Sequence, residues 1–129
     1  MDKMLSGKAN NTTDGAHAEA QAAAFLASRG LRVEARNFRV RGGEIDLVCR
    51  DGATLVFVEV RLRRNAAYGG AAASITATKQ RRLILAARHY LARVPDTPCR
   101  FDCVLLSGLG DTDGGIEWIR DAFSAGTDA

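Results

Sequence analysis

Three carboxylates stand inside two apolar runs of one short stretch, GEIDLVCRDGATLVFVEVRLR, residues 43–63. Glu44 and Asp46 belong to the first run and Glu59 to the second, with Arg61 two residues further on. Acids that converge from neighbouring strands suit a hard cation such as Mg²⁺, which takes carboxylates, water and substrate phosphate as ligands. Such a cation polarises a phosphodiester and activates water. The stretch predicts a metal or phosphate site; solvated acids and an edge-strand charge pair are the alternative.

The two runs read as a β-hairpin that turns at Asp51-Gly52, a pair of residues typical of tight hairpin turns. With that turn, Asp46 faces Phe57 and Glu44 faces Glu59 across the hairpin. Asp46 and Glu59 are then diagonal neighbours, roughly 5–8 Å apart. A change of register by one residue would send these two carboxylates to opposite faces of the sheet, because side chains alternate along a strand.

An acid also lies on the apolar side of the first predicted helix. That helix begins at Thr13 or Asp14 and runs to about Arg29, before Gly30. Glu19 stands three, four and seven residues before apolar members of the helix, which places it in the middle of their face. We expect Glu19 to point inward, where it could hold a metal-bound water or a second ion. The apolar members are Ala22, Ala23, Phe25 and Leu26.

A second helix is predicted from Ser74 or Thr76 to about Arg93. Its apolar stripe, extended back by one turn, brings Lys79 and Gln80 toward the face that packs on the sheet. Lys79 is therefore a candidate for the same site, and a solvated helix lysine is the alternative interpretation.

The remaining apolar runs complete the predicted fold. Residues 31–39, 99–108 and 116–120 read as strands, and DAFSA after the last strand reads as a short helix or a tail. The order of one helix, three strands, a second helix and two strands predicts an α/β or α+β arrangement with a mixed sheet and flanking helices. A chain of 129 residues is most simply one domain. We place that domain at residues 14–125, after a disordered tail at 1–13.

Composition limits the function classes. The net charge of +3 and the pI near 9.0 permit nucleic-acid binding without requiring it. No stretch has the length and apolarity of a membrane span, and the first residues lack the apolar core of a signal peptide. Three cysteines without metal-site spacing predict buried free thiols and a cytoplasmic protein. Several arginines could contact phosphate around the site, or be solvated surface charge: Arg36, Arg39, Arg41, Arg63, Arg64, Arg81 and Arg82.

The order and spacing of several segments closely resemble the YraN-type family, an uncharacterised bacterial group. Its restriction-endonuclease-like fold is similar to that of archaeal Holliday junction resolvases. The resemblance covers about residues 14–123. It is carried by AEAQAAAFLASRGL, RNFRVRGGEIDLV, LVFVEVRLR, YGGAAASITATKQRRL, CRFDCV and IEWIRDAF.

The resemblance implies an α-β-β-β-α-β nuclease core and a divided motif in which Asp, then Glu-x-Lys, bind Mg²⁺ or Mn²⁺ at a phosphodiester. Asp46 and Glu59 match the metal carboxylates, and Glu19 matches a helix-borne acid beside them. Arg61 stands where the motif has lysine. Arginine stays charged and can stabilise phosphate, but it is a poor base, so Lys79 is a candidate substitute.

The function implied is a divalent-metal-dependent endonuclease acting on DNA, including structured or branched DNA. Two alternatives remain: a non-catalytic nucleic-acid-binding module on a nuclease scaffold, and a protein-interaction domain whose acids serve charge pairing. Relatives that cut symmetric junctions are dimers, which makes a homodimer compatible with this function.

Overall fold

The computed structural model describes residues 6–62, 75–107 and 115–125. Within them the chain forms an α/β fold, and the predicted order of one helix, three strands, a second helix and two strands is confirmed. The elements are α1 (Ser6–Ser28), β1 (Arg32–Val40), β2 (Gly43–Asp51), β3 (Thr54–Leu62), α2 (Ala77–Leu91), β4 (Cys99–Leu106) and β5 (Ile116–Phe123).

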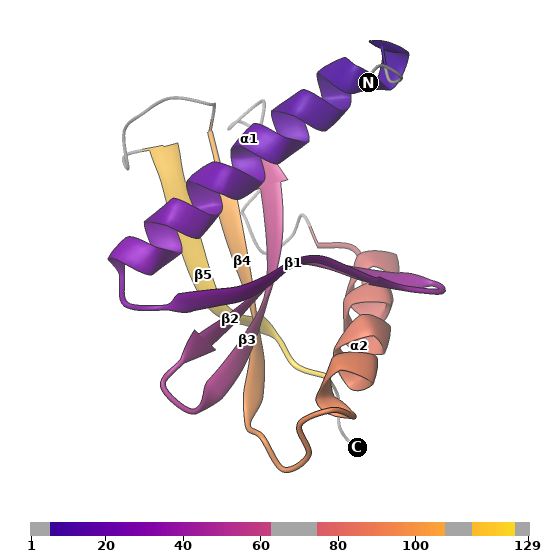
Figure 1. The fold of residues 1–129 in the computed structure, drawn as a ribbon, viewed down its shortest axis with the longest axis vertical. Helices are drawn as coiled ribbons and strands as arrows, with labels where there is room; N and C mark the ends of the chain where they lie inside the picture. The colour runs from indigo at the N-terminus through magenta and orange to yellow at the C-terminus, as the bar shows by residue number, and fades with distance from the viewer. Residues whose placement is uncertain (1–5, 63–74, 108–114, 126–129) are drawn as a thin grey trace.

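The five strands form one mixed sheet in the order β1-β2-β3-β4-β5. Neighbouring strands are antiparallel except for β3 and β4, which are parallel. A parallel neighbour cannot be reached by a tight turn, because the chain must cross back over the sheet. The segment that contains α2 makes this crossover (Figure 1).

The two helices cover opposite faces of the sheet, and the core lies in two layers. In Figure 1, α1 runs diagonally across the strands and α2 lies beside the β1–β2 hairpin. Ala22 and Leu26 of α1 are fully buried, as predicted. The layer beneath α1 includes Leu47, Val58 and Val104, and the layer beneath α2 includes Ile45, Phe57, Leu83 and Phe101.

The helix ends follow local chemistry. α2 has Thr76 as its N-cap, whose side-chain oxygen accepts a hydrogen bond from the backbone N–H of Lys79 at 3.1 Å; this was one of the two predicted starts. α1 ends before Gly30, which takes the left-handed φ of 99° that glycine adopts without cost. The helix begins at Ser6 rather than at Thr13. No proline lies between those two positions to stop it.

The turn between β2 and β3 differs from the predicted one. Asp51 pairs with Thr54, so the two turn residues are Gly52 and Ala53 rather than Asp51 and Gly52. Gly52 supplies the single left-handed residue, with φ 63°, as in turns with glycine first. Asp51 is held in the strand by an ion pair with Arg100, 3.0 Å between Oδ2 and Nη1. The expected pairings of Asp46 with Phe57 and of Glu44 with Glu59 are therefore wrong.

The end of the chain also differs from the prediction of a short helix or a tail. Strand β5 continues through Phe123, which pairs with Phe101 and stacks on its ring with centroids 4.8 Å apart. The three cysteines are free, as predicted. Cys49 and Cys103 are buried, but Cys99 is exposed at the start of β4. In the described ranges, no helix is long and apolar enough to cross a membrane.

A buried acid in β4 ties together three parts of the sheet. The Asp102 carboxylate accepts hydrogen bonds from Arg100 Nε at 3.0 and 3.2 Å, from Trp118 Nε1 at 2.9 Å and from the Asp121 backbone N–H at 2.8 Å. Asp121 has a left-handed φ of 54°. The sequence analysis gave Asp102 no role, although an acid between Phe101 and Cys103 in an apolar run was a visible signal. Its partners explain how a charge is tolerated there.

Candidate functional site

Strands β2 and β3 stop pairing where the acids begin. The hydrogen-bonded register runs from Asp51–Thr54 to Leu47–Val58, and one further step places Asp46 opposite Glu59. There the Asp46 side chain takes over the role of a backbone partner. Its Oδ2 accepts the Val60 N–H at 2.8 Å. The carboxylate of Asp46 is thus fixed at the point where the two strands separate.

Glu59 is the buried centre of the site, with only 3% of its surface exposed. Its Oε2 lies 2.9 Å from Nζ of Lys79 and 3.7 Å from Nη1 of Arg61. Lys79 comes from the first turn of α2, which the Thr76 cap holds in place. Two cations that reach one buried carboxylate reduce the cost of removing its charge from water. Lys79 therefore forms an ion pair with Glu59, although 41% of its side chain remains exposed.

The pKa of Asp46 is strongly shifted by its surroundings. Burial and, after it, the negative charge of Glu59 are the main causes that raise the pKa of Asp46 from 3.8 to about 7. The Val60 hydrogen bond opposes these effects, Glu19 adds to them, and Lys79 acts against them. Because the negative charge of Glu59 disfavours the ionised form of Asp46, a cation bound between the two carboxylates would be favoured. Such perturbed acids are frequent at functional sites.

Glu19 reaches the edge of this site through β1. Its Oε1 accepts a hydrogen bond from Nδ2 of Asn37 at 3.0 Å. The pairs on either side, Arg36 with Leu47 and Phe38 with Ile45, place Asn37 opposite Asp46. Asn37 has a left-handed φ of 51°, which asparagine adopts more readily than most residues. The sequence analysis did not identify Asn37, and its type beside Phe38 was the only available signal.

The donor set fits a hard divalent ion. Asp46 and Glu59 offer carboxylate oxygens from adjacent strands, and Mg²⁺ commonly binds through one or two carboxylates with water and phosphate completing its shell. Among residues 6–62, 75–107 and 115–125, no three His, Cys, Asp or Glu side chains gather as a ready-made metal cage. Glu19 is hydrogen-bonded to Asn37 instead of joining the two strand acids. The observed geometry therefore offers two carboxylates, those of Asp46 and Glu59, as protein ligands for such an ion.

The other candidates lie apart from this centre. Glu44 is 3.7 Å from Arg39 across the hairpin, an exposed pair. Gln80 donates to the Ile75 carbonyl at 3.1 Å. Four of the seven candidate phosphate-binding arginines are on β1 and α2 and are exposed, and Arg41 is exposed between β1 and β2, whereas Arg63 and Arg64 lie outside the described residues. The exposed arginines are Arg36, Arg39, Arg41, Arg81 and Arg82.

Comparison with known proteins shows which chains this one resembles. A model of the uncharacterised protein family UPF0102 matches residues 18–106. A UPF0102 protein of Dechloromonas aromatica is 60% identical over 120 residues, which cover 92% of this chain and 96% of the relative. A UPF0102 protein of Methylobacillus flagellatus is 60% identical over 111 residues, 86% of this chain and 96% of the relative. One of Paracidovorax citrulli is 53% identical over 128 residues, 93% and 91%.

Proposed function

The chain belongs to the uncharacterised protein family UPF0102, and we propose that it is a divalent-metal-dependent endonuclease that acts on DNA. The observation that carries the proposal is the pair of acids at the separation of β2 and β3. Glu59 is buried and contacts two cations, and Asp46 is held by the Val60 N–H with a pKa raised to about 7 by burial and by Glu59.

Each residue has a role that its position supports. Asp46 and Glu59 would hold Mg²⁺ or Mn²⁺, which supplies Lewis-acid polarisation of a phosphodiester and activation of water. Arg61 and Lys79 would bind and stabilise the negative charge of the phosphate, which needs fixed donors in a partly dry site. Lys79 lies beside Glu59, so it can also accept or release a proton where arginine cannot. Glu19, at the edge of the site, would position a water molecule or an ion.

A matched pair of variants tests the proposal. The purified full chain is incubated with linear, flapped and four-way DNA, with Mg²⁺ or Mn²⁺ or with chelator. We expect cleavage that needs the metal and that is reduced at least about a hundredfold in Glu59→Gln. Glu117→Gln, which removes one carboxylate from the exposed side of β5, is the control and retains full activity. No metal-dependent cleavage of any of the three DNA forms would refute the proposal.

A second function has one specific observation in its favour. The ammonium of Lys79 lies 2.9 Å from a carboxylate oxygen of Glu59, and this ion pair would also suit a scaffold that binds nucleic acid but no longer cuts it. Salt-sensitive DNA binding that is the same in chelator and in Mg²⁺, with no cleavage and no change in Glu59→Gln, would identify this non-catalytic binding module. Absence of DNA binding at low salt would leave a protein-interaction domain.

A further inference from the structure

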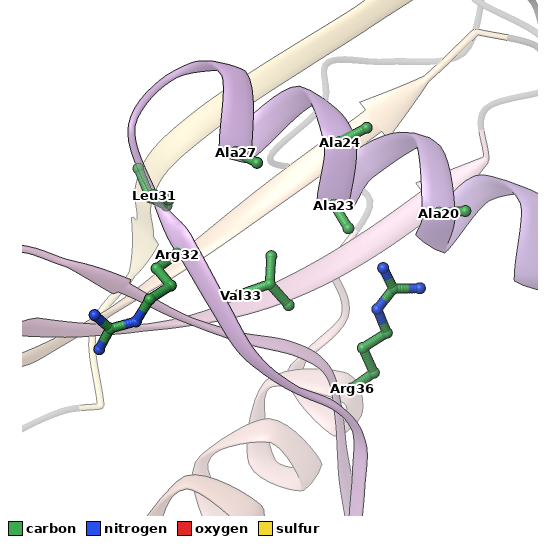
Figure 2. A pocket seen from close by; sticks show the side chains of 8 residues that line it. All are labelled: Ala20, Ala23, Ala24, Ala27, Leu31, Arg32, Val33 and Arg36. Atoms are coloured by element: carbon green, nitrogen blue, oxygen red, sulfur yellow. The ribbon is translucent and has the colours of Figure 1, made fainter.

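Two hollows lie along the seam between α1 and β1, and we call them together the α1–β1 groove. Its outer part has a volume of about 390 Å³ and runs between the alanines of α1 and the first half of β1 (Figure 2). Its inner part, about 250 Å³, is lined by Gly15, Ala16, Glu19, Asn37 and Arg39. Small side chains on the helix leave this seam open, because larger ones would fill the space above the strand.

Arginines form the other wall of this α1–β1 groove. In Figure 2 the guanidinium of Arg36 reaches toward Ala20, Val33 points at Ala23, and Arg32 stands at the outer end with its guanidinium turned from the helix. Strand alternation would place only every second residue on this face. The left-handed Asn37 interrupts that alternation, so that positions 36, 37 and 39 all line the groove.

The inner end of the groove belongs to the site already described. Asn37 stands opposite Asp46 in the sheet and donates to Glu19. Arg36, next to Asn37, pairs with Leu47. From Arg32 to Arg39 the strand extends over roughly 23 Å. A ligand that lies along this seam would therefore end beside Asn37, the residue opposite Asp46 in the sheet.

We propose that the α1–β1 groove holds one unpaired nucleic-acid strand by its phosphates and directs that strand to Asp46 and Glu59. The inference deepens the proposed function and rests on it for the chemical nature of the ligand. The positive charge of Arg32, Arg36 and Arg39 is complementary to a row of phosphates. Of these, Arg39 also forms an ion pair with Glu44, with 3.7 Å between Nε and Oε1.

The dimensions select a single strand over a duplex. The volume of about 390 Å³ lies in the range of pockets for drug-sized molecules, which have about the bulk of one nucleotide. The volume of about 250 Å³ lies below that range, and a double helix cannot enter either hollow. The lining contains no aromatic ring on which a base could stack. Binding through the backbone alone predicts little sequence preference and a strong dependence on salt. The substrate class would be DNA with a free or displaced strand.

Fluorescence anisotropy of labelled oligonucleotides tests the groove in chelator, where nothing is cut. The double variant Arg32→Gln, Arg36→Gln should weaken single-strand binding about tenfold or more at low salt and flatten the salt dependence by roughly one unit of slope. Arg88→Gln removes one positive charge from an exposed position on α2 and should leave binding unchanged. Ala20→Leu adds bulk beside Arg36 with little change in helix propensity and should weaken binding without altering the salt slope.

Three results would overturn the groove assignment. One is equal weakening by Arg88→Gln and by the double variant. Another is duplex binding as tight as single-strand binding with no effect of Ala20→Leu. The third is full competition by an acidic peptide, which would make the groove a peptide site. If the binding pattern holds and no DNA form is cut with Mg²⁺, the endonuclease proposal fails and the groove stands. If DNA is cut, and the double variant changes neither the binding nor the rate of cleavage, the endonuclease proposal stands and the groove assignment fails.

Discussion

The ammonium of Lys79 lies 2.9 Å from a carboxylate oxygen of Glu59, a residue with 3% of its surface exposed. A helix thereby supplies the cation for an acid on the central strand. If Glu59 binds a metal ion as proposed, Lys79 and the ion would compete for the same oxygen.

Lys79→Met should destabilise the metal-free protein by about 1–2 kcal/mol. Glu59 would keep only Arg61 at 3.7 Å, and a buried charge that loses a partner is costly. Millimolar Mg²⁺ should then raise the unfolding temperature of Lys79→Met more than that of the wild type. Urea and thermal denaturation measure both effects. Arg81→Met, which removes an exposed cation two residues along the same helix, is the control; an equal response to Mg²⁺ in both variants would refute the competition.

Asp46 should make stability depend on pH. Its pKa is raised from 3.8 to about 7 by burial and by Glu59, so the folded state holds this proton more tightly than the unfolded state does. The free energy of unfolding therefore falls as pH rises from about 4 to about 7, and this contribution is constant above that range. Asp46→Asn cannot ionise and should gain on the order of 2–4 kcal/mol over wild type across the interval.

Urea denaturation in chelator near pH 5 and near pH 8 measures this difference. Asp96→Asn is a suitable control, since Asp96 is exposed and its left-handed φ of 62° is one that asparagine accepts. Identical pH slopes for Asp46→Asn and wild type would show that Asp46 is not the titrating group. Mg²⁺ binding should also strengthen as pH rises toward 7, because the ion requires the ionised carboxylate.

Asp102→Asn should cost about 1.5–3 kcal/mol, because the buried acceptor of Arg100 and Trp118 loses its charge and one of its acceptor positions. Asp51→Asn is a matched comparison, since Asp51 also pairs with Arg100 but has 37% of its side chain exposed. The cost there should be within about 1 kcal/mol. Unfolding followed by the fluorescence of Trp118 reports directly on the Asp102 network. Equal losses in the two variants would place the stabilisation in Arg100 alone.

Gly43→Ala should destabilise the protein by about 1–3 kcal/mol through overpacking. A Cβ at Gly43 would lie 2.5 Å from the carbonyl oxygen of Arg82 and 3.1 Å from the nitrogen of Ala86, so α2 would have to move off the hairpin. Gly15→Ala, where nothing lies within 4 Å, should instead stabilise α1 by roughly 0.5–1 kcal/mol. Calorimetry of the two variants compares them. A neutral Gly43→Ala would contradict the close approach of α2 and β2.

The order of elements could be predicted because each has its own local signal. The apolar runs of β2 and β3 and the stripe of α2 are readable without tertiary context. The proximity of Asp46 and Glu59 could be inferred from their positions on the two predicted strands. Their register could not, because it depends on Gly52 taking the left-handed position and on Asp51 pairing with Arg100, a residue 49 positions away in the sequence.

The parts that were missed depend on long-range contacts. Strand β5 continues past Arg120 because Asp102 accepts the backbone N–H of Asp121, which no local pattern of DAFSA reveals. Asn37 was visible only as an asparagine in a strand, whereas Lys79 was already a candidate because the apolar stripe of the second helix extends toward it. Their roles appear when the crossover brings α2 to Glu59 and when β1 pairs with β2.

The parallel pairing of β3 with β4 sets an order of assembly. Strands β1, β2 and β3 are joined by short turns, so they can pair early and bring Asp46 and Glu59 together from nearby parts of the chain. Lys79 and strand β4 arrive only after the crossover has been synthesised and closed, which is a slow, non-local step. Until then the nascent sheet contains two neighbouring acids without their lysine. Closure of the crossover is therefore also the step that gives Glu59 a second cation, in addition to the nearby Arg61.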